Sequence, residues 1–238
     1  MRSPRFFVKH PLNAGEALQL PQSVSHHMLH VLRMKTGDQA TLFNGSGSEF
    51  PVTITHIKRS NVSVTIDESE SISRESSLTT VLALAVLKNN AMDAALTRAT
   101  ELGVTEIVPV MTDRCSKPRA RDEHWQDVIQ SSCEQCGRNQ LPHLSSMCNL
   151  DDWLASAPQG LRLLANPLAA DSLKEIASNP TTVSILIGPE GGLASNEIEA
   201  AEHAGFTSIA LGHRILRAET APAALLALVQ YRWGDFTQ

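Results

Sequence analysis

The stretch TTVSILIGPEGGLASNEIEAAEHAGFTSIALGHRILRAETAPAALLAL, residues 181–228, contains two successive strand-to-helix units. Thr182 to Ile187 is an apolar run of the length of a buried strand. We expect Ser195 to cap a helix that ends at the next glycine, with Glu197 in its first turn, where the helix dipole favours an acid. A second strand is expected over Ser208 to Leu211. The stretch therefore predicts strands that are joined by crossover helices.

The second unit ends in a helix that we expect to begin near Thr220. Pro222 is compatible with this start, because the amides of the first turn have no partner within the helix. We expect the helix to bury four apolar side chains, Leu225, Leu226, Leu228 and Val229. Strands that alternate with helices in this way are typical of a parallel sheet covered by helices.

The same alternation continues toward the N-terminus. Leu78 to Leu87 is a nearly continuous apolar run, as in a buried parallel strand. A helix is predicted over Lys88 to Leu102, and Gly103 suits the position that ends it. The remaining predicted elements are strands at Ile107 to Val110 and Arg162 to Ala165 and a helix from Asp122 to about Cys136. Residues 75–238 are thus expected to form an α/β domain with a mostly parallel sheet.

The first 66 residues have a different pattern, that of a small β-rich module. Strands are predicted over Gln39 to Phe43, Val52 to Ile57 and residues 62–66, where apolar and polar side chains alternate. One short helix is expected from about Ser25 to Met34. Residues 67–77 (DESESISRESS) are polar and form the best linker of the chain, so we expect a first domain over residues 1–70.

Charge is distributed unevenly over the 238 residues. The chain has a net charge of −5, yet residues 1–66 carry seven Lys/Arg against three Asp/Glu, a net of +4 that leaves −9 for the rest. A basic module attached to an acidic one is expected where one part contacts phosphates. Small β modules are also often mildly basic without binding anything. No apolar run approaches the roughly 20 residues of a membrane span, so we expect a cytoplasmic protein without a membrane partner.

Two patterns could suggest a metal, and we expect none. Cys133 and Cys136 form a CxxC, but the second pair needed for a closed zinc site is missing and the segment has the pattern of a helix. His26 and His30 stand at i and i+4, but the metalloprotease signature would require Glu after the first histidine. We therefore interpret the cysteines as half-buried helical thiols and the histidines as exposed or facing RNA.

Three loops that follow predicted strands are candidates for a ligand site, because open α/β sheets bind ligands beyond the carboxyl ends of their strands. They are Ala165-Asn166-Pro167, Gly188-Pro189-Glu190-Gly191-Gly192 and the segment 212–220. Glycines at such places let a ligand approach the backbone closely. The GxxxxGK[ST] sequence of P-loop proteins and the GxGxxG of dinucleotide folds are both missing, which disfavours an ATPase and a nicotinamide oxidoreductase.

At these loops the sequence resembles the RsmE family of the SPOUT methyltransferases. Five segments carry the resemblance in the family's order: RSPRFF (2–7) with HHMLHVLRMKTGD (26–38), RATELGV (98–104), CEQCGRNQLP (133–142), IGPEGGLASNEIEAAEHAGF (187–206) and LGHRILRAETAPAALLAL (211–228). Arg98 departs from the family, which usually has lysine there. The matching segments extend over nearly the whole chain.

The resemblance implies a fold and an activity that composition and periodicity did not show. It implies a SPOUT-type parallel sheet with a C-terminal trefoil knot, a PUA-like N-terminal β-barrel that helps to hold RNA, and a homodimer. The implied reaction is methylation of N3 of one specific uridine of 16S rRNA in the small ribosomal subunit, with S-adenosyl-L-methionine as the methyl donor. A SPOUT enzyme acting on another RNA, such as tRNA, or a non-catalytic RNA-binding protein, remains the alternative.

Carried over onto the matching loops, the resemblance also implies a cofactor site. Glu190 would help to balance the sulfonium charge or, equally, hold the loop through nearby amides. The cofactor-binding residues so implied are Leu164, Asn166, Ile187, Gly188, Pro189, Glu190, Gly191, Gly192, Leu211, Gly212, Ile215, Leu216 and Arg217.

Chemistry at a uracil N3 requires the enzyme to favour the imide anion, because this nitrogen is protonated near neutral pH. Arg217 is our first candidate for stabilising that anion, with Arg138 as a companion. Glu219 would orient Arg217 through a bidentate pair. The alternative is that Arg217 and Glu219 form only a structural ion pair.

Six cations are candidates for phosphate contacts with RNA. Three lie on the N-terminal module and three on the loop after the second predicted strand of the α/β domain: Arg5, Arg33, Lys35, Arg114, Lys117 and Arg119. Each such contact should contribute to a loss of binding as salt rises. The alternative is that these charges are merely solvated.

Overall fold

The computed structural model describes residues 3–115 and 121–237, and it divides the chain into two compact units. The first unit comprises residues 1–75 together with 130–141, and the second comprises residues 76–129 and 142–238. The boundary after Glu75 lies in the segment expected to be a linker. The discontinuity was not expected, because residues 130–141 had been placed with the α/β domain.

The N-terminal unit is built on a sheet of six short strands. The strand order is β1-β3-β4-β5-β2, with β6 paired to β4, and only the β1–β3 pair among these is parallel. The bounds are β1 Arg5–Phe7, β2 Ala17–Gln19, β3 Gln39–Phe43, β4 Ser48–Lys58, β5 Asn61–Ile66 and β6 Glu70–Ser71. The three predicted strands are confirmed, and the alternation over β5 buries Val62, Val64 and Ile66.

The predicted helix of this unit begins earlier and ends earlier than expected. It consists of α1 Gln22–His26 continued by a π-helical turn, His27–Val31. The wider turn is visible in the hydrogen bond from Leu32 N to His27 O, 3.1 Å long. Val24 and Met28 are buried against the sheet and fix the segment to the core. The helix ends before Arg33, which has a positive φ of 57°.

The C-terminal unit contains a fully parallel seven-stranded sheet, as predicted. Its order is β10-β8-β7-β12-β11-β13, with β9 paired to β8. The bounds are β7 Thr79–Ala85, β8 Glu106–Met111, β9 His143–Leu144, β10 Cys148–Asn149, β11 Leu161–Ala165, β12 Thr182–Ile187 and β13 Thr207–Ile209. Strands β7 and β12 lie in the middle of the sheet and are almost entirely buried, which explains their continuous apolar sequences.

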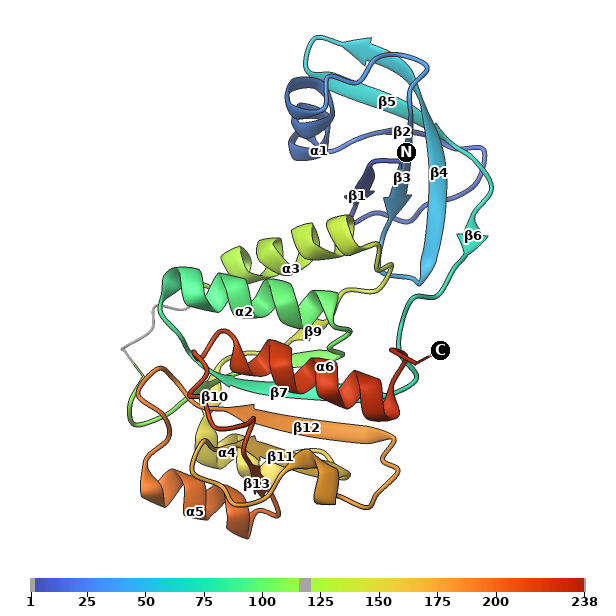
Figure 1. The fold of residues 1–238 in the computed structure, drawn as a ribbon. Coiled ribbons are helices and arrows are strands. Elements are labelled where there is room, and N and C mark those ends of the chain that lie inside the picture. Colours follow the sequence, from blue (N-terminus) through green and yellow to red (C-terminus); the bar gives the residue numbers. More distant parts are fainter. Residues whose placement is uncertain (1–2, 116–120, 238) are drawn as a thin grey trace. The chain divides into compact units, whose positions relative to one another are not determined.

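Helices cover both faces of this sheet. In Figure 1, α2 (Asn89–Glu101) and α6 (Ala221–Trp233) lie together on one face, and α4 (Leu150–Ser156) and α5 (Ser195–His203) lie on the other. Met92, Ala95, Leu96 and Ala99 of α2 are buried, and Gly103 follows the helix with a φ of 78°, as the sequence predicted. The helix α3 (Asp122–Cys136) has the predicted bounds and is followed by Gly137.

Three details of the predicted elements are wrong. Ser195 is the first residue of α5, not its cap, and Glu197 accepts a hydrogen bond from the amide of Ala194 instead. Leu228 is 45% exposed, so α6 buries Leu225, Leu226 and Val229 without it. Strand β13 ends at Ile209, which leaves Leu211 in the following loop.

Among the described residues, no helix combines the length and apolar character needed to cross a membrane.

Candidate cofactor site

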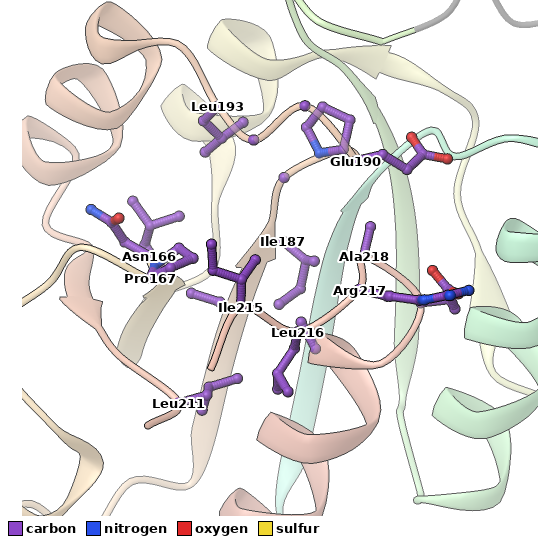
Figure 2. Close-up of a pocket in the computed structure, with 18 of the residues that line it drawn as sticks. Asn166, Pro167, Ile187, Glu190, Leu193, Leu211, Ile215, Leu216, Arg217 and Ala218 are labelled. Carbon is purple, nitrogen blue, oxygen red and sulfur yellow. The ribbon is translucent and has the colours of Figure 1, made fainter. Parts of the chain in front are cut away.

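The site is formed where three neighbouring strands end. β12, β11 and β13 are adjacent in the sheet, and the loops after Ile187, Ala165 and Ile209 line one cavity of about 960 Å³. This size is within the range of cofactor pockets. In Figure 2, Asn166 and Pro167 lie on one side of the cavity, and Glu190 and Arg217 lie on the other. The expectation that the strand-end loops share one edge of the sheet is therefore confirmed.

All thirteen residues that the resemblance implied for the cofactor line this cavity. Pro167, Arg214 and Ala218 of the candidate loops line it as well. The cavity also includes residues that the sequence analysis did not assign to a ligand site, among them Lys88, Asn90, Ala91, Leu168 and Leu193, together with Arg114, which had been expected to contact phosphate. Lys88, Asn90 and Ala91 follow β7, the neighbour of β12. Ligands bind beyond the carboxyl ends of the strands in open α/β sheets. Applied to β7 as well, this rule would have identified these three residues.

The backbone of the cavity wall is accessible at two glycines. Gly192 and Gly212 have positive φ angles of 69° and 86°, and an added Cβ at either position would meet no atom within 4 Å. Side chains rarely adopt this conformation, so glycine is required there for the shape of the loop. Apolar residues beside this backbone, such as Ile187, Leu211 and Leu216, provide a surface on which a planar ring can pack.

Glu190 holds the loop after β12. Its Oε1 accepts a hydrogen bond of 3.1 Å from the amide of Lys88, which precedes α2. A carboxylate in this place also faces the positive end of the helix dipole. Of the two roles considered for Glu190, this contact supports that of holding the loop.

The loop after β8 contacts the loop after β12 as well. Arg114 Nη1 donates hydrogen bonds to the carbonyls of Gly191 (2.9 Å) and Leu193 (3.3 Å). The buried carboxylate of Glu197 accepts from the amides of Asp113 and Ala194, each at 2.7 Å. Arg114 had been expected to contact phosphate; its guanidinium is instead bonded to the cavity wall.

Arg217 lies at the rim with an 85% exposed side chain. Its Nη1 lies 3.8 Å from Oε1 of Glu219, too far for a hydrogen bond, so the expected bidentate pair is not formed. Glu219 is more enclosed, and its backbone carbonyl accepts a hydrogen bond of 3.0 Å from Arg98. The loop is thus held at Glu219, while the guanidinium of Arg217 is available to a substrate.

Arg138 is not among the residues that line the cavity. It belongs to the N-terminal unit, where its buried guanidinium donates to both carboxylate oxygens of Glu75, with Nε 3.2 Å from Oε1. The guanidinium expected to assist Arg217 is therefore paired with a carboxylate of its own unit.

Arg5 is buried as well, contrary to its expected role in binding phosphate. Its Nη1 lies 2.7 Å from Glu49 Oε1, its guanidinium is 5.0 Å from the ring of Phe43, and its side chain is only 4% exposed. Asn139 accepts from Arg5 and donates to Glu49. Arg74 completes the cluster with a further ion pair to Glu49. These contacts hold the Arg5 guanidinium inside the unit, away from solvent.

The CxxC lies on α3, as expected, and Cys133 is buried. Burial raises the pKa of the Cys133 thiol to about 12. Thiol redox chemistry proceeds through the thiolate, which burial disfavours at this position. In residues 3–115 and 121–237, no three His, Cys, Asp or Glu side chains are grouped as a metal would require.

Two of the proposed phosphate contacts are exposed on the N-terminal unit. Arg33 and Lys35 follow the π-helical turn, and no Asp or Glu occurs between Ala17 and Gly37. His26 and His30 are exposed on the same segment, with ring centroids 4.6 Å apart. A π-helical turn and a positive φ at a non-glycine residue are both rare and occur preferentially at functional sites. Lys117 and Arg119, the other two candidates, lie outside the described residues.

Comparison with known proteins gives a family match for each of the two units. Residues 74–230 match the model of an RNA methyltransferase domain, and residues 20–67 match that of an RNA methyltransferase PUA domain. The ribosomal RNA small subunit methyltransferase E of Buchnera aphidicola is 31% identical over 99% of both chains. The chain belongs to the ribosomal RNA small subunit methyltransferase E family.

Solved structures agree with this family in both sequence and fold. A methyltransferase of Legionella pneumophila, solved with bound SAM, is 35% identical and has a TM-score of 0.95 over 99% of this chain and all of that one. Methyltransferase E of Neisseria gonorrhoeae, bound to S-adenosylmethionine, is 34% identical with a TM-score of 0.93 over the same shares.

Proposed function

We propose that this protein transfers the methyl group of S-adenosylmethionine to N3 of uridine U1498 in the 16S rRNA of the small ribosomal subunit. The observation that carries the proposal is the single cavity lined by all thirteen residues expected to hold the cofactor. Two methyltransferase relatives of at least 34% identity, both solved with this cofactor bound, share the fold over 99% of the chain. A substrate in ribosomal subunits places the protein in the cytoplasm.

Some residues of the cavity bind the cofactor, and others act on the base that is methylated. S-adenosylmethionine supplies a methyl group on a positively charged sulfur. The apolar residues around Ile187 and Leu216 exclude water, and the open backbone at Gly192 and Gly212 admits the cofactor. Arg217, exposed at the rim, stabilises the uracil N3 as an anion, and Glu219 limits the range of Arg217.

The test is transfer of labelled methyl from S-adenosylmethionine to small ribosomal subunits that lack the modification, followed by mapping of the modified nucleotide. A single N3-methyluridine at U1498 is expected. Transfer to another RNA, such as tRNA, would keep the cofactor and change the substrate. Binding of the cofactor without transfer to any RNA would support a non-catalytic RNA-binding protein instead.

We also propose that the N-terminal unit contacts the phosphates of the rRNA through Arg33 and Lys35. Both are exposed beside the strained π-helical turn, in a segment without acids. Replacing either with alanine should reduce the slope of log K against log salt by about 1, because each phosphate contact releases bound counterions. The measurement is equilibrium binding to the small subunit between low and moderate salt.

Arg59→Ala provides the control for these two variants. It removes the same charge from an exposed residue of the same unit, in the turn between β4 and β5. If the slope of log K against log salt is unchanged in Arg33→Ala and Lys35→Ala, these two residues do not contact phosphate. If Arg59→Ala reduces the slope equally, the charges of the unit act without specific contacts.

The proposed assembly is a homodimer whose C-terminal unit contains the trefoil knot implied by the resemblance. Leu228 and Tyr231 on α6 support an interface, since these large side chains are 45% and 64% exposed on a mostly apolar helix. We expect light scattering to give twice the chain mass of 25.8 kDa. A monomer at micromolar concentration would argue against the dimer.

A further inference from the structure

Arg114 has contacts that neither its exposure nor its sequence context predicts. It lies one turn after β8, and Nη1 donates to the carbonyls of Gly191 at 2.9 Å and Leu193 at 3.3 Å. Both of these residues line the cofactor cavity. The aliphatic part of Arg114 also packs beside Gly191, where an added Cβ would lie 3.5 Å from Arg114 Cβ.

These contacts connect the loops of two strands that are not neighbours in the sheet. The order β8-β7-β12 separates Arg114 by one strand from the loop that it binds, so the side chain reaches past the carboxyl end of β7. The backbone amide of Asp113 makes a second link in the same direction, to Glu197 on α5. Arg114 itself lines the cavity, so the loop after β8 supports the loop after β12 at the edge of the cavity.

The loop after β12 needs such support because its sequence is intrinsically flexible. Of the six residues 188–193, three are glycines, and Gly192 has a positive φ. Glycine loses more conformational freedom on ordering than any other residue. Within the loop, the amide of Gly192 donates to the carbonyl of Pro189 at 2.8 Å. The carbonyls of Gly191 and Leu193 are bonded instead to the charged donor of Arg114.

We infer that Arg114 is a positioning residue that fixes the Gly188–Leu193 loop in the conformation that accepts S-adenosylmethionine. This inference rests on the proposed function, since it assigns the cavity to that cofactor. Arg114 stabilises the cofactor-binding form of the loop before the cofactor arrives, so less freedom is lost on binding. Although Arg114 also lines the cavity, its guanidinium donates to backbone carbonyls, and the inference gives it no part in methyl transfer.

The test is calorimetric titration of the full-length protein with S-adenosylmethionine, in the absence of RNA. Arg114→Ala should raise the Kd about tenfold, because hydrogen bonds from a charged donor are lost. Arg114→Met keeps the length of the aliphatic chain and should bind as weakly as Arg114→Ala. Arg114→Lys, which retains a charged donor, should recover part of the affinity. Arg121→Ala, which removes the same charge between β8 and α3, is the matched control and should leave the Kd unchanged.

A kinetic measurement distinguishes positioning from catalysis and from RNA binding. In Arg114→Ala the KM for S-adenosylmethionine should rise about as much as the Kd, while kcat at saturating cofactor stays within about twofold of the wild type. The salt dependence of binding to the small subunit should not change. If Arg114→Ala fails to fold, Arg114→Met and Arg114→Lys still distinguish the contribution of the aliphatic chain from that of the charged hydrogen-bond donor.

Three results would overturn the inference. An unchanged Kd in Arg114→Ala or Arg114→Met would show that the hydrogen bonds do not position the loop. A salt slope reduced by about 1, with an unchanged Kd, would make Arg114 a phosphate contact. Failure of the wild-type protein to bind S-adenosylmethionine would overturn the proposed function first, and this inference with it.

Discussion

Replacing Arg217 with alanine is expected to lower the turnover number by about 10²–10³-fold while changing the affinity for S-adenosylmethionine by less than about threefold. The expected size is that of removing one preorganised donor from a developing anion. The guanidinium is 85% exposed and lies 3.8 Å from Glu219, so its loss leaves no buried group without a partner. Single-turnover methylation of the small subunit, with a separate cofactor titration, measures the two effects.

The pH dependence of this variant tests the assigned role directly. If Arg217 stabilises the N3 anion of uracil, a rising hydroxide concentration should partly replace it, and the deficit of Arg217→Ala should shrink in alkaline buffer. Glu219→Gln is the companion variant and should cost only about tenfold, because it weakens the orientation of Arg217 without removing it. Equal losses of turnover and cofactor affinity, or a pH-independent deficit, would assign Arg217 to cofactor binding or to the fold.

Replacing Glu49 with alanine should destabilise the N-terminal unit by about 3–5 kcal/mol. Removing one partner of a buried ion pair leaves the other charge without compensation, and the Arg5 side chain is only 4% exposed. Glu49 is also bonded to Arg74 and Asn139, so three partners are affected at once. The free energy of unfolding from urea titration measures the effect. The exposed Glu70→Ala provides a control and should change it by less than about 0.5 kcal/mol.

The same cluster predicts an acid-sensitive contribution to stability. Burial raises the pKa of Glu49, but the hydrogen bonds and charges of Arg74 and Arg5 outweigh it, and the net pKa lies below the usual glutamate value. A pKa that is lower in the folded than in the unfolded state gives stability that is complete above the unfolded pKa. This contribution is lost as the pH falls through the folded value. The difference in the free energy of unfolding between wild type and Glu49→Gln should therefore shrink in acid. A difference that persists at low pH would show that the contribution does not depend on the charge of Glu49.

The position of the cavity could be predicted because the residues that indicate it are close together in the sequence. Each glycine-containing loop directly follows an apolar run, and the carboxyl ends of parallel strands must share one edge. β7, β12 and α3 were placed within a few residues for the same reason: their patterns repeat over enough residues to be distinct. Strands β9 and β10 contain two residues each, too few for any periodicity, and were missed.

The errors concern side chains whose environment depends on distant residues. Arg5 was expected to bind phosphate, yet it packs with Glu49 and Asn139, which are 44 and 134 positions away in the chain. Arg138 was expected beside Arg217, yet it is paired with Glu75. Charge alone cannot distinguish a buried ion pair from a solvated cation, because the partner is identified only once the chain has folded.

The discontinuous composition of the N-terminal unit limits how the protein can be dissected or recombined. Residues 130–141 belong to this unit and contribute Asn139, which bonds both Arg5 and Glu49. A gene fragment that stops after Glu75 would encode all six strands but omit Asn139 of the buried cluster. Exchange of this N-terminal unit between related proteins would therefore have to transfer two separate pieces of coding sequence together.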